Sequence, residues 1–100
     1  MIEVAEKDLA LIQRILHAHL PGAKIWAFGS RTKGTAKRGS DLDLAVDAAA
    51  PLDFSARTHL VNTLDEAPLA FNVDLVDLHA ISPEFRAIID AHKIPLPGFE

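Results

Sequence analysis

Two hydrophobic periodicities alternate along this chain, and their order constrains the fold more than any other feature. Within residues 5–20, apolar side chains recur at helical spacing from Leu9 to Leu20, and Pro21-Gly22 ends the pattern. Short runs rich in β-forming residues follow, and each predicts a strand: residues 24–28, 41–46 and 71–76. Because strands and helical segments alternate, the sequence predicts an α/β (α+β) fold with helices packed on one sheet.

The segments between the strands carry signals for helix starts and stops. Residues 30–36 are expected to open as a short helix, and residues 37–40 read as a loop. Asp53 is a candidate cap for the next helix. The buried positions expected in that helix are Leu60, Val61 and Leu64.

A last helix is expected to begin at Ser82-Pro83, since serine is a good N-cap and proline suits the first turn. Its expected buried positions are Phe85, Ile88 and Ile89. Trp26 and Phe28 are expected to fill the core rather than to stack on a base. The two places that could supply a partner-binding patch are the Leu9/Ile12/Leu16 helix and the tail at residues 95–99.

Composition narrows the classes of protein. A length of 100 residues predicts one domain over residues 1–100, and 49% hydrophobic residues are enough to build a core. The absence of cysteine excludes a disulfide framework and a thiolate zinc site. The sequence shows no signal peptide and no apolar stretch of membrane-spanning length, so a cytoplasmic location is expected.

Charge is distributed unevenly. The formal net charge is −4, yet residues 31–38 hold four cations (Arg31, Lys33, Lys37 and Arg38) and no acid, which leaves −8 for the rest. An acidic body does not provide the broad basic face that nucleic-acid binding needs. One basic loop suits a small polyanion such as a triphosphate, although four solvated cations on an exposed loop are an equally ordinary reading.

Three acids fall on strands. Side chains alternate along a strand, so Asp41 and Asp43 share one face, and Asp74 is set apart from Val73 and Leu75 in the same way. If the two strands are neighbours, three carboxylates converge, and such an oxygen-only group suits Mg²⁺ or Mn²⁺. The pattern alone is weak, because exposed strand faces often alternate acid and leucine.

Gly29-Ser30 follows the first strand and is placed to begin a helix. Free N–H groups and the helix dipole attract phosphate at such a position, and glycine permits close approach of the backbone. Arg31, Lys33 and Lys37 then lie within reach of a triphosphate. A plain turn and helix cap is the alternative for Gly29-Ser30. Ser40 either ends the loop or helps to position a phosphate.

The order of these features resembles the signature of the DNA polymerase β-like nucleotidyltransferase superfamily. The resemblance rests on Gly29-Ser30-Arg31, Gly34, Ser40-Asp41-Leu42-Asp43-Leu44 and Val73-Asp74-Leu75-Val76-Asp77. It is nearest to the smallest members, the minimal nucleotidyltransferase (MNT) proteins. The resemblance implies a mixed sheet with a three-stranded core and helices on one face.

The resemblance also implies roles. Asp41 and Asp43 would hold two metal ions, and Asp74 would complete the site and orient or deprotonate the attacking hydroxyl. Gly29, Ser30, Arg31, Lys33 and Ser40 would bind the nucleotide. Asp77 has the opposite strand phase and is expected to be a strand-end or surface carboxylate.

Two functions follow from the resemblance. In the first, the protein is an enzyme that transfers a nucleoside monophosphate, AMP from ATP, to a hydroxyl of a partner, with a HEPN-domain toxin as the expected partner of an MNT antitoxin. In the second, it neutralises its partner by binding alone. The sequence does not identify the acceptor or the triphosphate that is used. It also leaves open whether the protein forms a homo-oligomer or a hetero-oligomer.

Overall fold

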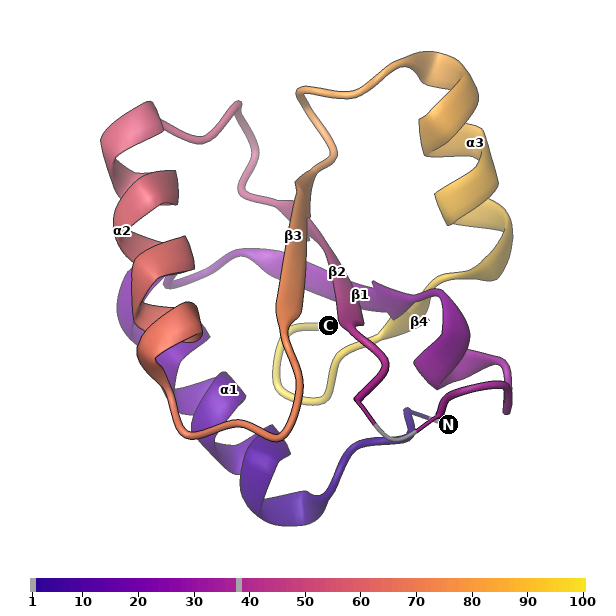
Figure 1. Ribbon diagram of the computed structural model, residues 1–100. Coiled ribbons are helices and arrows are strands. Elements are labelled where there is room, and N and C mark those ends of the chain that lie inside the picture. Colours follow the sequence, from indigo (N-terminus) through magenta and orange to yellow (C-terminus); the bar gives the residue numbers. More distant parts are fainter. Residues whose placement is uncertain (1, 38) are drawn as a thin grey trace.

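A four-stranded mixed sheet organises the molecule (Figure 1). The computed structural model describes residues 2–37 and 39–100. In chain order its elements are α1 (Glu6–His19), β1 (Lys24–Phe28), the 3₁₀ turn η1 (Ser30–Thr32), β2 (Leu42–Asp47), α2 (Phe54–Glu66), β3 (Val73–Asp77), α3 (Pro83–His92) and β4 (Ile94–Pro95). The strand order is β3-β2-β1-β4; β2 and β3 are parallel, and β1 is antiparallel to both of its neighbours. The predicted α/β class with a mixed sheet is confirmed.

One face of the sheet packs against α1 and α2. Alternate strand residues point toward this layer because side chains change face at each step along a strand. The buried cluster includes Ile25, Ala27, Leu42, Leu44, Val46, Val73 and Leu75 from the strands, and Ile12, Leu16, Leu60 and Leu64 from the helices. The predicted inward positions Leu60 and Leu64 are confirmed, while Val61 is half-buried. The other strand face is therefore left for α3 and for polar side chains.

The third helix covers part of that second face. Ile89 of α3 is buried with Ala45 and Leu78, and half-buried Trp26 and Phe28 pack against this cluster. The expectation of helices on one face is thus wrong for α3. Without α3, the apolar side chains of Ala45 and Trp26 would face water on the second face of the sheet. Packing of α3 against them removes this apolar surface from water.

The face that α3 turns inward is narrower than its sequence suggested. Ile89 is 1% exposed, but Phe85 is 39% exposed and Ile88 is 63% exposed. The expectation that all three are buried is wrong for Phe85 and Ile88. A helix of ten residues that contacts the sheet along one line buries a single row, and the neighbouring positions stay at the margin.

The C-terminal tail belongs to the fold rather than to a free surface. Ile94–Pro95 forms β4 and pairs with β1, while Leu96 and Phe99 are buried. The Phe99 ring also stacks on His17, with centroids 4.1 Å apart. Both sequence-based places for a partner patch are therefore wrong, since the tail and the Ile12/Leu16 row of α1 lie in the core.

The predicted helix caps are confirmed. The Asp53 carboxylate accepts a hydrogen bond from the Ala56 N–H at 3.1 Å, and the Ser82 hydroxyl accepts one from the Phe85 N–H at 3.2 Å. Within residues 2–37 and 39–100, no helix is both long and apolar enough to cross a bilayer.

Candidate active site

A single row of register partners crosses three strands of the sheet. Phe28 of β1 is paired with Asp43 of β2, and Asp43 is paired with Asp74 of β3. Residues paired across neighbouring strands project to the same face. Asp43 and Asp74 therefore stand side by side on the second face, the one that α3 covers only in part.

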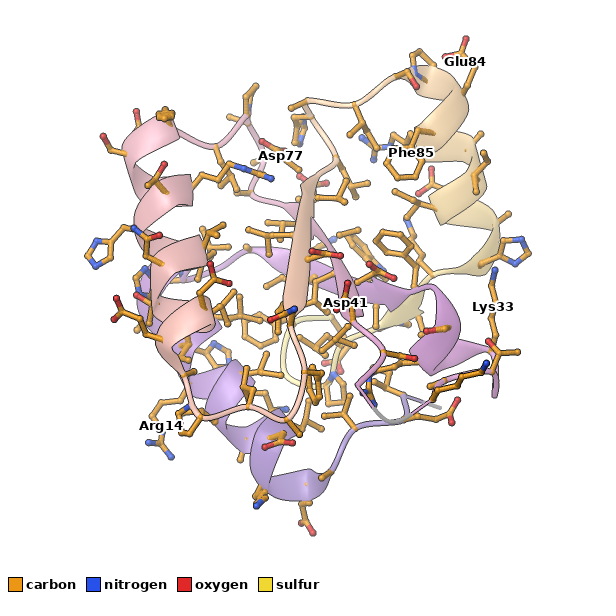
Figure 2. The ribbon with its side chains drawn as sticks, viewed as in Figure 1. Arg14, Lys33, Asp41, Asp77, Glu84 and Phe85 are labelled. Atoms are coloured by element: carbon orange, nitrogen blue, oxygen red, sulfur yellow. The ribbon has the colours of Figure 1, made fainter. Side chains whose placement is uncertain are left out.

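Asp41 joins this pair from the loop that enters β2. It lies one residue before the strand, where the sequence placed it inside the strand, and it is exposed (Figure 2). Partial burial raises the pKa of Asp43, and the nearby carboxylates of Asp74 and Asp41 raise it further. Partial burial and the Asp41 carboxylate likewise raise the pKa of Asp74. The structure thus brings the three predicted acids together as mutually repelling neighbours.

The donor set of this cluster fits a hard divalent cation. As they stand among the described residues, no three acidic or histidine side chains form a group that could hold a metal ion. The three aspartates are crowded without a counter-charge, and they offer only oxygen, which Mg²⁺ and Mn²⁺ prefer. Partial burial and mutual repulsion raise the pKa values of Asp43 and Asp74, and a cation between the carboxylates would offset the repulsion.

The Gly29 turn touches the acid cluster. Gly29 has φ +82° and ψ −158°, a combination that is essentially restricted to glycine. A Cβ at this position would collide with Oδ2 of Asp43. The Gly29 carbonyl accepts hydrogen bonds from the Thr32 N–H at 3.1 Å and the Thr32 hydroxyl at 2.8 Å. This closure fixes the turn beside the Asp43 carboxylate.

The turn at Gly29 exposes backbone N–H groups that could bind an anion, but it does not continue into an α-helix. A short helix begins at Ser30 as expected, but it is one 3₁₀ turn. The expected extent to residue 36 is wrong, because η1 ends after Thr32 and Gly34 adopts φ +72°. In the described part of the chain, the N–H groups of Ser30 and Arg31 donate to no backbone carbonyl. The Ser30 hydroxyl has no protein partner among the described side-chain hydrogen bonds. An anion here would meet these three donors rather than a helix dipole.

Ser40 and Lys33 lie differently from Ser30. The Ser40 hydroxyl accepts a hydrogen bond from the Lys37 N–H at 2.8 Å, which closes the loop before β2. Lys33 is exposed, and Figure 2 shows its side chain directed into solvent on the side of η1 away from Asp41. Neither side chain makes a described hydrogen bond to the Gly29 turn, and Arg38 lies outside the described residues.

Arg31 has a structural position in this chain. Its Nε donates to the Ser40 carbonyl at 2.8 Å and its Nη1 donates to the Glu3 carbonyl at 2.7 Å. The guanidinium also lies over the Phe71 ring, 4.3 Å from the centroid. Arg31 therefore ties the N-terminal segment and the loop before β2 to the fold, and its side chain is not directed at the predicted phosphate position.

A cavity that the sequence did not reveal opens beside the acids. It has a volume of about 800 Å³, and Asp43 and Asp74 line it together with Phe28 of β1 and Phe85 of α3. Arg57 of α2 also borders it, while donating to the Leu75 carbonyl at 2.8 Å on the outer edge of β3. The sequence signal for Phe85 was its apolar spacing, which did not distinguish a core position from a cavity wall.

Asp77 is buried and structural. Its carboxylate accepts hydrogen bonds from the Leu52 N–H at 2.7 Å and from the His79 N–H at 2.9 Å. The strand-end position is confirmed, but the side chain is only 5% exposed, so a surface location is wrong. It holds the loop before α2 against the end of β3.

Comparison with known proteins identifies similar chains. The family described as "Polymerase beta, Nucleotidyltransferase" matches residues 11–96. The chain is 44% identical over 88 residues to the probable protein adenylyltransferase MntA of Haemophilus influenzae, covering 88% of this chain and 77% of that relative. It is similar to a crystal structure described as a toxin-antitoxin with AMP-PNP, with 34% identity, a TM-score of 0.75, and 94% and 74% of the two chains covered. A structure of tri-AMPylated Shewanella oneidensis HEPN toxin in complex with MNT antitoxin matches with 31% identity and a TM-score of 0.70, covering 93% of this chain and 71% of that one.

Proposed function

The chain belongs to the polymerase beta nucleotidyltransferase family, and on that basis we propose that it is an antitoxin that transfers AMP from ATP to a hydroxyl of a HEPN-type toxin. The observation that carries this proposal is the contact between the Gly29 turn and Asp43, with Asp74 and Asp41 alongside. This contact supports the proposal, because it joins a turn with free N–H groups to a group of carboxylate oxygens. A protein that acts by binding alone has no physical need for either.

The donor nucleotide is placed by the turn. The N–H groups of Ser30 and Arg31 and the Ser30 hydroxyl bind the triphosphate, which approaches closely because residue 29 has no side chain. The proposal gives Gly29 and Ser30 the nucleotide-binding roles that the sequence predicts. Arg31 contributes its backbone rather than its guanidinium, and Lys33 contributes long-range positive charge. The relative that was solved with AMP-PNP supports ATP as the donor.

Asp41, Asp43 and Asp74 would hold the metal, which we propose to be Mg²⁺ or Mn²⁺. When bound, this metal would neutralise the negative charge of the three carboxylates and of the phosphates. The acceptor oxygen attacks the α-phosphorus, the bond from that phosphorus to the bridging oxygen breaks, and pyrophosphate leaves. The Asp74 carboxylate takes the proton of the attacking hydroxyl. The protein contributes mainly position and charge.

The partner brings the acceptor. The HEPN toxin in the similar Shewanella oneidensis complex is tri-AMPylated, so a toxin of that class is the proposed acceptor for this chain, in a hetero-complex. A cytoplasmic site of action is part of the proposal, since ATP is supplied there. Neutralisation by binding alone remains the competing outcome of the test.

The test uses ATP labelled at the α-phosphorus. The chain and a co-expressed HEPN partner are incubated with Mg²⁺, and labelled partner is sought by gel and by a mass increase of one AMP. Asp41→Asn and Asp74→Asn serve as matched inactive controls that keep the fold. Labelling that requires both aspartates supports the proposal. A complex that silences the toxin without label, across several triphosphates and both metals, would overturn it.

A further inference from the structure

The strand that carries Asp74 has a neighbouring strand on one side only. β3 ends the strand order β3-β2-β1-β4, and Figure 1 shows it at the open edge of the sheet with α2 alongside. The Leu42 N–H donates to the Asn72 carbonyl at 2.9 Å, and the Leu78 N–H donates to the Val46 carbonyl at 3.0 Å. Backbone groups alternate in direction along a strand, so the even-numbered residues from 72 to 78 face β2, and Leu75 faces the open edge.

Arg57 of α2 binds this open edge. Its Nη2 donates to the Leu75 carbonyl at 2.8 Å, and within residues 2–37 and 39–100 this is the one side-chain hydrogen bond to the outer edge of β3. Arg57 is half-buried, and it lines both the cavity of about 800 Å³ beside Asp74 and a second cavity of about 320 Å³ beside Asp77. Because there is open space on both sides, packing alone does not force the guanidinium into this position. The hydrogen bond to Leu75 offsets the rotamer freedom that a long side chain loses when it is held.

The bond lies one residue from Asp74, where β3 carries negative charge toward its neighbour. Asp74 is paired with Asp43 across the two parallel strands. Partial burial, then the Asp41 carboxylate and, with a smaller effect, Asp65 raise the pKa of Asp74, and a hydrogen bond with Asp43 lowers it. Like charges therefore push β3 away from β2 until a cation is bound, and an edge strand has no further strand behind it to resist. Arg57 is not among the causes of this pKa shift, so it acts through the strand backbone rather than through its charge.

Resting on the function proposed above, we propose that Arg57 is a positioning residue for Asp74. By holding the Leu75 carbonyl, it keeps β3 close enough to β2 for Asp74 and Asp43 to share one cation. The same bond holds the Asp74 carboxylate where it receives the proton of the attacking hydroxyl. Arg57 has no part in the proposed nucleotide-binding turn. Lysine would keep a donor at this position, whereas methionine would keep only the apolar stem.

Mn²⁺ binding by the isolated chain tests the inference without a partner. The signal of free Mn²⁺ is followed by electron paramagnetic resonance during a titration. Arg57→Met is expected to raise the Kd for Mn²⁺ about tenfold, as does the loss of other groups that orient a metal ligand. Arg57→Lys should restore most of the affinity. A wild-type affinity in Arg57→Met would overturn the inference.

Arg86→Met is the matched control. Arg86 of α3 is also half-buried, and its Nη1 donates to the Leu78 carbonyl at 3.3 Å, directly after β3 but four residues beyond Asp74. Each variant loses one hydrogen bond from an arginine to a carbonyl, so urea unfolding should show similar losses of stability. Only Arg57→Met should weaken Mn²⁺ binding. Equal Mn²⁺ affinities in the two variants would overturn the inference, because Arg57 would then be a general support of the fold.

Kinetics with the HEPN partner separate this inference from the proposed function. At saturating Mg²⁺, Arg57→Met should lower kcat for AMP transfer about tenfold and leave KM for ATP unchanged, because Arg57 is not part of the Gly29 turn. Mn²⁺ binding that depends on Arg57, in a chain that labels no partner, would refute the proposed function and support the inference. Full labelling by Arg57→Met, or a rise in KM for ATP alone, would refute the inference and leave the function standing.

Discussion

Gly29 and the Asp43 carboxylate are in such close contact that no side chain fits between them. The proposed phosphate turn and the proposed metal ligand are therefore parts of one packed unit, although they lie fourteen positions apart in the sequence. This contact predicts that the site tolerates no larger residue at position 29.

Gly29→Ala should abolish transfer and destabilise the fold. The backbone at φ +82° and ψ −158° costs about 1–3 kcal/mol for alanine, and the new methyl group must also displace Asp43. Thermal unfolding and the labelling assay measure the two effects. Gly34→Ala is the matched control, since Gly34 also has positive φ, +72°, but open space where a Cβ would stand. A Gly34→Ala protein that loses as much activity as Gly29→Ala would contradict the role given to the contact.

Asp43→Asn should separate catalysis from stability. Removing this charge should reduce transfer about 100-fold or more, because a metal ligand is lost. In metal-free buffer the same change should raise the melting temperature. Partial burial of the Asp43 charge and its repulsion from Asp74 and Asp41 raise the pKa of Asp43, and both costs disappear with the charge. Calorimetry with and without Mg²⁺ measures this. A lower melting temperature in both buffers would show that Asp43 is a structural carboxylate.

Much of this architecture follows from local pattern. The strands around Asp43 and Asp74 were predictable because leucine and valine alternate with acids there, and the caps at Asp53 and Ser82 because their side chains satisfy local N–H groups. The sequence also predicted that the acids converge, on the assumption that their two strands are neighbours. The structure confirms that assumption, because β2 and β3 are parallel neighbours and Asp43 is paired with Asp74.

The remaining features depend on contacts that are distant in sequence. Pro95 reads as a helix stop, yet Ile94–Pro95 becomes an edge strand because β1 has a free side to pair with. The sequence predicts Arg31 as a phosphate ligand. In the structure its guanidinium instead contacts the Ser40 and Glu3 carbonyls and the Phe71 ring, and the sequence does not reveal that these groups lie beside it. Spacing alone did not reveal that Phe85 lines a cavity, since its exposure is set by the angle at which α3 meets the sheet.

Arg31→Ala is predicted to destabilise the fold rather than to act on ATP alone. Two hydrogen bonds from a charged group and a contact with an aromatic ring are lost, for an expected decrease of about 2 kcal/mol in the free energy of unfolding. Urea unfolding measures the change. Lys33→Ala should stay within about 0.5 kcal/mol of the wild type, since Lys33 is exposed. If Arg31→Ala folds as stably as the wild type but loses affinity for ATP, the guanidinium binds phosphate after all.

The pair of Asp47 and His79 predicts a pH dependence at the opposite end of the sheet from the site. His79 Nε2 lies 2.7 Å from Oδ1 of Asp47, and the same oxygen accepts the Ala49 N–H at 2.9 Å. The hydrogen bond from His79, followed by that from Ala49, lowers the pKa of Asp47, and Arg86 adds a smaller effect of the same sign. A lowered pKa in the folded state means that this carboxylate stabilises the fold above its ordinary pKa of 3.8 and that the stabilisation is lost as the pH falls through the folded value.

His79→Ala should therefore raise the pKa of Asp47 toward 3.8 and reduce stability at pH 5, with the difference from the wild type shrinking on acidification. Carboxyl NMR titration measures the pKa, and urea unfolding at several pH values measures the stability. His92→Ala is the control, because His92 is exposed at the end of α3 and does not appear among the groups that shift Asp47. An Asp47 pKa that is the same in His79→Ala as in the wild type would mean that the short Asp47–His79 contact does not persist in solution.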